Sequence, residues 1–89
     1  MKVRQYGALN GDYRGIMIFA KRLAGQGHTR QFTIEHHAAS GWVAREQDDR
    51  GTHTSMIRDW RHVEATIALF ELKATALRNE GWLDIASNT

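Results

Sequence analysis

The sequence contains no cysteine and no proline. The lack of cysteine excludes disulfides, thiolate metal sites and a cysteine nucleophile together, and it is typical of proteins in the reducing cytoplasm. No apolar run approaches the roughly 20 residues of a membrane span, and the first residues are polar rather than the apolar core of a signal peptide. We therefore expect a soluble, cytoplasmic protein with no membrane partner.

The usual signatures of catalysis and cofactor binding are missing as well. Ser40 and Ser55 lie in no glycine-flanked nucleophile elbow, and the sequence has no phosphate loop and no dinucleotide motif. His36 and His37 are neighbours on a predicted strand, so they point to opposite faces, and no histidine spacing is typical of a metal site. The sequence thus predicts no metal and no cofactor, and an enzyme is the least favoured class of function.

The charge of the chain is unevenly distributed. Residues 1–30 hold six basic residues and one acidic residue, a net charge of +5, whereas residues 31–89 hold six basic and nine acidic residues, a net charge of −3. A basic segment of this kind either solubilises the chain or contacts a polyanion. At 89 residues the chain makes one domain with a modest core, so burial between subunits would add stability.

A helix over residues 59–81 has the clearest signals in the chain. Asp59 is suited to cap its N-terminus, and Gly81 is suited to the left-handed position that ends a helix. Apolar residues recur at steps of three and four and predict a buried stripe. The stripe consists of Trp60, Val63, Ile67, Phe70, Ala74 and Leu77. Trp60 and Trp82, at the two ends, are predicted to pin the helix to the rest of the fold.

A second apolar stripe runs along the same predicted helix, nearly opposite the first. It consists of Ala65, Leu69, Leu72 and Ala76. A single small domain would leave both leucines in water, so this stripe requires a cover, such as a second copy of the helix or the N-terminal segment folded back. The alternative is two isolated exposed leucines, which are normal on protein surfaces. We predict that these four residues form a homodimer interface.

Four segments between residues 16 and 57 have the alternation or the β-branched composition of strands. Three glycine-containing segments, 25–27, 39–41 and 49–51, indicate three-residue loops that connect these strands. With those loops Ala20 lies opposite Phe32. Ala44 then lies opposite His36 on one neighbouring strand and opposite Met56 on the other.

The predicted fold is α+β: an antiparallel meander of four strands, followed by one long C-terminal helix packed on one face of the sheet. A fifth strand is added if Asn10-Gly11 forms a type I′ hairpin. The single domain, residues 1–89, divides into a basic arm or hairpin (1–15), antiparallel strands (16–57), the helix (59–81) and a tail (83–89). This order of elements resembles that of the Whirly single-stranded DNA-binding fold, in arrangement only and without a shared motif.

The predicted register places one set of side chains beneath the helix and another on the opposite face. The set beneath the helix is Ile16, Ile18, Ala20, Phe32, Ile34, Trp42, Ala44 and Met56. The set on the opposite face is Met17, Phe19, Lys21, Thr33, Glu35, His37, Val43, Arg45, His53 and Ile57. This second surface mixes apolar, aromatic and basic groups, so it is either an ordinary solvated face or a contact surface.

Together these features predict a small non-enzymatic interaction module that forms a homodimer. Single-stranded nucleic acid, bound weakly and without sequence preference, is the leading ligand hypothesis, because basic side chains can neutralise phosphates and a ring can stack on a base. The predicted nucleic-acid contacts are Phe19, Lys21, Arg22, Arg30 and Arg45. The alternative is a module that binds a small molecule or another protein.

Overall fold

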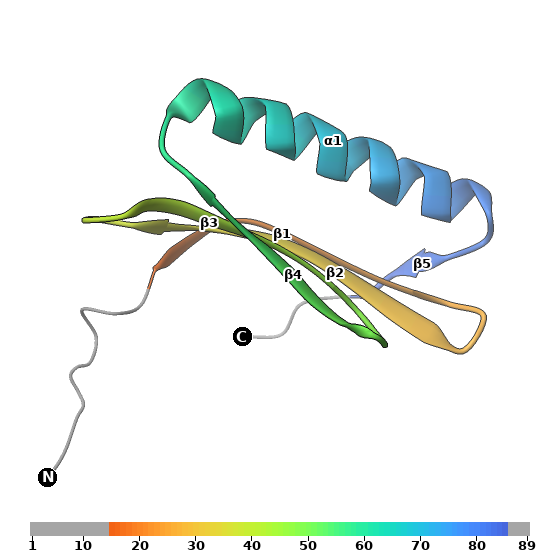
Figure 1. Cartoon of the computed structure of the whole chain (residues 1–89). Coiled ribbons are helices and arrows are strands. Elements are labelled where there is room, and N and C mark those ends of the chain that lie inside the picture. Colours follow the sequence, from red (N-terminus) through yellow and green to blue (C-terminus); the bar gives the residue numbers. More distant parts are fainter. Residues whose placement is uncertain (1–14, 86–89) are drawn as a thin grey trace, which may run out of the picture.

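The computed structural model describes residues 15–85, which form a five-stranded antiparallel sheet with one helix lying across it (Figure 1). The elements are β1 (Ile16–Gly25), β2 (His28–His37), β3 (Gly41–Asp48), β4 (Gly51–Ile57), α1 (Trp60–Asn79) and β5 (Leu83–Asp84). The strand order is β4-β3-β2-β1-β5. The predicted α+β fold, a meander followed by a helix on one face, is therefore confirmed. The fifth strand among the described residues is β5, and the hairpin predicted at Asn10-Gly11 lies outside those residues.

Both predicted ends of α1 are confirmed by their hydrogen bonds. The Asp59 carboxylate accepts the backbone N–H of His62 at 2.9 Å. At the other end, Gly81 has a φ of 99°, and its N–H donates to the Arg78 carbonyl at 3.0 Å. The N–H of Trp82 donates to the Leu77 carbonyl, also at 3.0 Å, which completes a Schellman motif. The helix boundaries are thus set by local capping chemistry.

The core lies between α1 and the face of the sheet beneath it, here called the covered face; the other side is the open face. Val63, Phe70, Ala74 and Leu77 of the predicted stripe are buried, and Ile67 packs against them partly buried. The first member of the stripe, Trp60, is instead 49% exposed. Trp60 occupies the first turn of α1, where its ring packs against that of Trp42, with ring centroids 5.8 Å apart.

The predicted register between β1 and β2 is wrong by one residue. Gln26 and Gly27 both have positive φ, 56° and 79°, so a two-residue turn of the I′ kind replaces the expected three-residue loop. Phe32 therefore lies opposite Lys21 rather than Ala20. Because side chains alternate along a strand, the shift of one residue brings Leu23, Lys21 and Phe19 to the covered face.

A bulge between Met17 and Phe19 shifts the pairing of β1 back again. Met17 lies opposite Glu35, on the open face as predicted, and Ile16 lies opposite His36. Ile18, which was predicted to pack under α1, occupies the bulge and is exposed. Because of the bulge, side chains of β1 before it lie on the predicted faces, whereas those after it lie on the opposite faces.

The turn between β3 and β4 is also shorter than predicted. The Asp48 carboxylate accepts the N–H groups of Arg50 and Gly51 at 2.8 and 3.2 Å, which closes a two-residue turn. Trp42 then pairs with Ile57, and Val43 pairs with Met56. The covered face therefore carries Ile57, which is buried, and the open face carries Met56, which is exposed. The predicted pairing of Ala44 with Met56 is wrong.

The turn between β2 and β3 also differs, but without changing the faces. His36 lies opposite Trp42 and Ile34 lies opposite Ala44, two residues away from the predicted register. A shift of two residues preserves the alternation, so Phe32, Ile34, Trp42 and Ala44 share the covered face as predicted.

The segment after α1 turns back onto the sheet. Leu83 and Asp84 pair with β1, and the buried ring of Trp82 lies against Gly25, where an added Cβ would be 2.5 Å from the Trp82 ring. Trp82 therefore holds the end of α1 to the β1–β2 hairpin, as predicted. Among residues 15–85, no helix has the combined length and hydrophobicity that crossing a bilayer would require.

Candidate interaction surfaces

The structure separates the predicted nucleic-acid contacts onto two faces of the sheet. Arg22 and Arg45 lie on the open face. The other three, Phe19, Lys21 and Arg30, lie on the covered face by their pairing. The Phe19 ring packs against that of Phe70, with centroids 6.0 Å apart. Placing Phe19 on the open face was therefore wrong, and no Phe, Tyr or Trp within residues 15–85 lies on that face.

The centre of the open face is an ion-paired surface. Glu35 contacts His37 at 3.0 Å and Arg45 at 3.3 Å. Burial raises the pKa of Glu35, but its hydrogen bonds to His37 and Arg45 and their charges outweigh burial and hold this pKa below its usual value. Arg45, the central cation of this face, is thus already paired with a carboxylate. Of the groups predicted for this face, His53 and Ile57 lie instead on the covered face.

A row of three tilted rings lies near the start of α1, and its last ring, Trp60, is half-exposed. The rings of His36 and Trp42 have centroids 5.1 Å apart, and Trp60 continues the series on the far side of Trp42. Arg58 and Arg61 flank Trp60 and are exposed, and neither forms an ion pair within the described part of the chain. We call these five residues the ring site.

Sequence reasoning missed the ring site because the helical period assigned Trp60 to the core. The available signal was the local sequence Arg58-Asp59-Trp60-Arg61, in which two cations flank an aromatic residue. A tryptophan in the first turn of a helix is less constrained to the core than one in the middle, because the helix has only begun to cover the sheet.

No residue within 15–85 covers the second stripe of α1. Leu69 is 48% and Leu72 is 68% exposed, and Ala65 and Ala76 are exposed as well. The four residues are spaced by four, three and four positions, so the stripe reads the same from both ends. A surface with this symmetry is suited to pairing with itself across a two-fold axis.

A groove of about 290 Å³ lies between α1 and the outer part of the sheet. Its lining residues from α1 include His62, Thr66, Leu69 and Lys73, and those from β4 are His53, Ser55 and Ile57. Glu46 forms part of the groove and accepts a hydrogen bond from Lys73 at 2.8 Å. The groove is slightly smaller than the roughly 300–1,000 Å³ of small-molecule pockets, so it suits individual side chains of a partner better than a whole cofactor.

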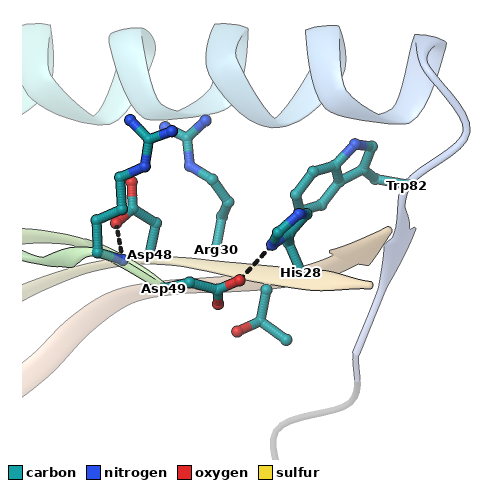
Figure 2. Close-up of a pocket in the computed structure, with 7 residues that line it drawn as sticks. His28, Arg30, Asp48, Asp49 and Trp82 are labelled. Atoms are coloured by element: carbon teal, nitrogen blue, oxygen red, sulfur yellow. Dashed lines mark hydrogen bonds and ion pairs between the residues drawn. The ribbon is translucent and has the colours of Figure 1, made fainter. Parts of the chain in front are cut away.

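A second hollow, of about 200 Å³, lies at the end of the two hairpins beneath the end of α1 (Figure 2). His28 hydrogen-bonds to Asp49, and the Arg30 side chain rises from the sheet toward α1. Arg30 pairs with Glu46, and its Nε, like Nε1 of Trp82, is buried without a partner among the described residues. Of the charged groups here, Asp49 is engaged by His28 and Asp48 by the backbone of its turn, and none of the lining residues is placed as a nucleophile beside a base.

Within residues 15–85, no three His, Asp or Glu side chains gather closely enough to hold a metal ion. No protein-family model, no curated protein and no solved structure matches this chain. The similarity in element order to the Whirly fold is therefore not accompanied by a structural match, and the function has to be argued from the surfaces themselves.

Proposed function

We propose that this protein is a small non-enzymatic interaction module that forms a homodimer through the outer stripe of α1. The observation that carries this proposal is the symmetric, exposed stripe. In an antiparallel pair of helices that places Leu69 opposite Leu72 of the second copy, Ala65 lies opposite Ala76. The same register places Arg61 opposite Glu80, so charges of opposite sign flank the apolar centre at both ends.

Magnitudes indicate a reversible dimer. Fully burying a leucine side chain contributes about 1.5–3 kcal/mol, and four half-exposed to two-thirds-exposed leucines per dimer therefore contribute roughly 4–8 kcal/mol. Association itself costs about 4–15 kcal/mol in lost translational and rotational freedom. The rest of the binding free energy must come from the close helix packing that the alanines permit and from the two charge pairs. We therefore expect a dissociation constant in the micromolar range or weaker.

Sedimentation velocity over about 10–500 μM tests the dimer, because that range brackets micromolar dissociation constants. The parent should shift from monomer to dimer with concentration, and the Leu69→Glu, Leu72→Glu variant should stay monomeric because it places four like charges in the interface. The matched control is Glu64→Gln with Glu71→Gln, two exposed residues of α1 outside the stripe, and it should dimerise as the parent does. A parent that is monomeric over the whole range contradicts the proposal.

A second candidate function is weak binding of single-stranded nucleic acid without sequence preference, now at the ring site. The half-exposed Trp60 ring between Arg58 and Arg61 supports it, because stacking on an aromatic ring contributes roughly 1–3 kcal/mol per base and arginines neutralise phosphates. Arg22 is one of the predicted nucleic-acid contacts. It is exposed and lies on the open face, away from α1.

Fluorescence titration with a labelled single strand at about 50 and 200 mM salt tests this function. Affinity should fall with salt at a log-log slope near −0.7 per phosphate contacted. Trp60→Ala should weaken binding and leave the slope unchanged, whereas Arg58→Gln with Arg61→Gln should make the slope shallower by about 1.4. Phe19→Leu is the control and should bind as the parent does. Absence of binding at the lower salt concentration contradicts this second function.

A further inference from the structure

β4 is an edge strand without the features that usually protect an edge. Among the described residues it pairs only with β3, and that pairing runs from Gly51 to Ile57 without a bulge. None of the five residues between these ends, 52–56, is Asp, Glu, Lys or Arg, and all five are exposed. Natural edges are commonly blunted by charges, prolines, bulges or covering segments. The outer side of β1, by contrast, carries a bulge and two cations and is partly covered by β5.

The pairing pattern indicates which groups of β4 point outward. In an antiparallel ladder, hydrogen-bonded and non-hydrogen-bonded pairs alternate, so every second residue directs its N–H and C=O away from the neighbouring strand. The pair Asp48 and Gly51 closes the two-residue turn and takes the hydrogen-bonded position. The residues with outward backbone groups are therefore Thr52, Thr54 and Met56.

The groove between β4 and α1 lies directly beside this edge. His53, Ser55 and Ile57 project from β4 into the groove, and Leu69 and Thr66 of α1 form its other wall. A strand added to β4 would direct every second side chain over this groove. Backbone pairing with an edge, combined with pockets for alternate side chains, is the general way in which sheets bind extended peptides.

The charges at the ends of β4 indicate the chemistry of the added strand. Arg50 precedes β4 and Arg58 follows it, and both are exposed. Nearby carboxylates are already engaged: Asp48 in the turn, Asp49 with His28 and Asp59 in the helix cap. Pairing of β4 with β4 of a second copy, centred on Thr54, would place Arg50 opposite the partner's Arg58 at both ends, which is unfavourable.

We infer that β4 accepts an extended acidic peptide as an additional strand, with alternate side chains of the peptide entering the groove between β4 and α1. The acidic residues lie at the two ends of the added strand, where they meet Arg50 and Arg58. The peptide site has Leu69 in common with the outer stripe of α1 and Arg58 in common with the ring site.

The probe is a fluorescein-labelled peptide of about five alternating valine and threonine residues with two glutamates at each end. Fluorescence anisotropy should show binding, and replacing the glutamates by lysines should weaken it at least about tenfold. N-methylation of alternate backbone nitrogens, which removes the pairing without altering the protein, should weaken it by a similar factor of about ten or more. Thr54→Pro should do the same, because it removes an outward N–H from an edge strand that tolerates proline.

The matched control is Thr54→Val, which keeps the outward N–H and should bind the peptide within about twofold of the parent. The circular dichroism spectrum of Thr54→Pro should match that of the parent. If the spectra differ, the variant is misfolded, and the binding of the N-methylated peptide decides whether β4 pairs with the peptide backbone. The proposal is overturned if no peptide binds at about 1 mM, or if the N-methylated and lysine peptides bind as well as the probe.

Discussion

Single residues connect the layers of this small domain, and Glu46 is the clearest case. Its carboxylate lies on β3 and accepts hydrogen bonds from Arg30 of β2 and Lys73 of α1. Burial raises the pKa of Glu46, but the hydrogen bonds and charges of Lys73 and Arg30 outweigh burial and hold the pKa below its usual value. Glu46 therefore ties the helix to two strands as a charged group.

The lowered pKa of Glu46 predicts how stability depends on pH. A carboxylate whose pKa is lower in the folded state contributes stability above its unfolded pKa and loses that contribution as pH falls through the folded pKa. Glu46→Gln should therefore cost about 1–2 kcal/mol near neutral pH, within the range for hydrogen bonds to charged groups at a partly exposed site. The difference between parent and variant should therefore shrink as pH falls below the ordinary glutamate pKa of about 4.3 and through the lowered pKa of folded Glu46.

Urea unfolding from pH 3 to 7 measures this difference. Glu64→Gln, at an exposed position on α1, is the control and should follow the parent within about 0.5 kcal/mol at every pH. A Glu46→Gln variant whose stability differs from the parent by the same amount at pH 3 and pH 7 would show that the ion pairs do not contribute.

At the scale of the element, α1 carries two apolar stripes with different roles. The inner stripe forms the core against β1, β2 and β3, and Phe70 lies at its centre, in contact with Phe32 at a centroid distance of 5.1 Å. The outer stripe, with Leu72, contributes to dimerisation in our proposal. Two substitutions on one helix therefore separate folding from association.

Phe70→Ala should lower the free energy of unfolding by about 3–5 kcal/mol, the usual cost of removing a buried phenylalanine ring. Leu72→Ala, measured at a few micromolar where the chain is monomeric, should change it by less than about 0.5 kcal/mol. Chemical denaturation followed by tryptophan fluorescence measures both. A loss below about 1 kcal/mol for Phe70→Ala would contradict the assignment of this ring to the core.

At the scale of the whole molecule, residues 15–85 leave three surfaces uncovered. They are the outer stripe of α1, the ring site at its start, and the outer edge of β4. The three have different chemistry: apolar and symmetric, aromatic and basic, and backbone-polar. They adjoin one another, because β4 leads directly into the start of α1 (Figure 1). Leu69 belongs to both the outer stripe and the groove beside β4, and Arg58 belongs to both the ring site and the end of β4.

The elements themselves could be predicted from the sequence because their signals are local. The Asp59 cap, the positive φ at Gly81 and the spacing of the inner stripe act within one or two turns, so α1 and its buried side follow directly. The meander was predictable for a similar reason, since glycine and aspartate mark its turns. The exposure of Leu69 and Leu72 followed from the inner stripe, because one helix cannot bury two opposite sides against one sheet.

Which side chains face the helix was decided only by the tertiary structure. Alternation along a strand has a period of two, so the choice between a two-residue and a three-residue turn reverses every side chain beyond it. Both turn lengths are compatible with the sequences around Gly27 and Gly51. Packing selects the two-residue turns, which bury Leu23 and Ile57. That selection moved Phe19 from the open face to the covered face, where it packs against Phe70. The sequence alone therefore determined four strands and the helix and their order, whereas β5 and the register that places the candidate sites were decided by the assembled core.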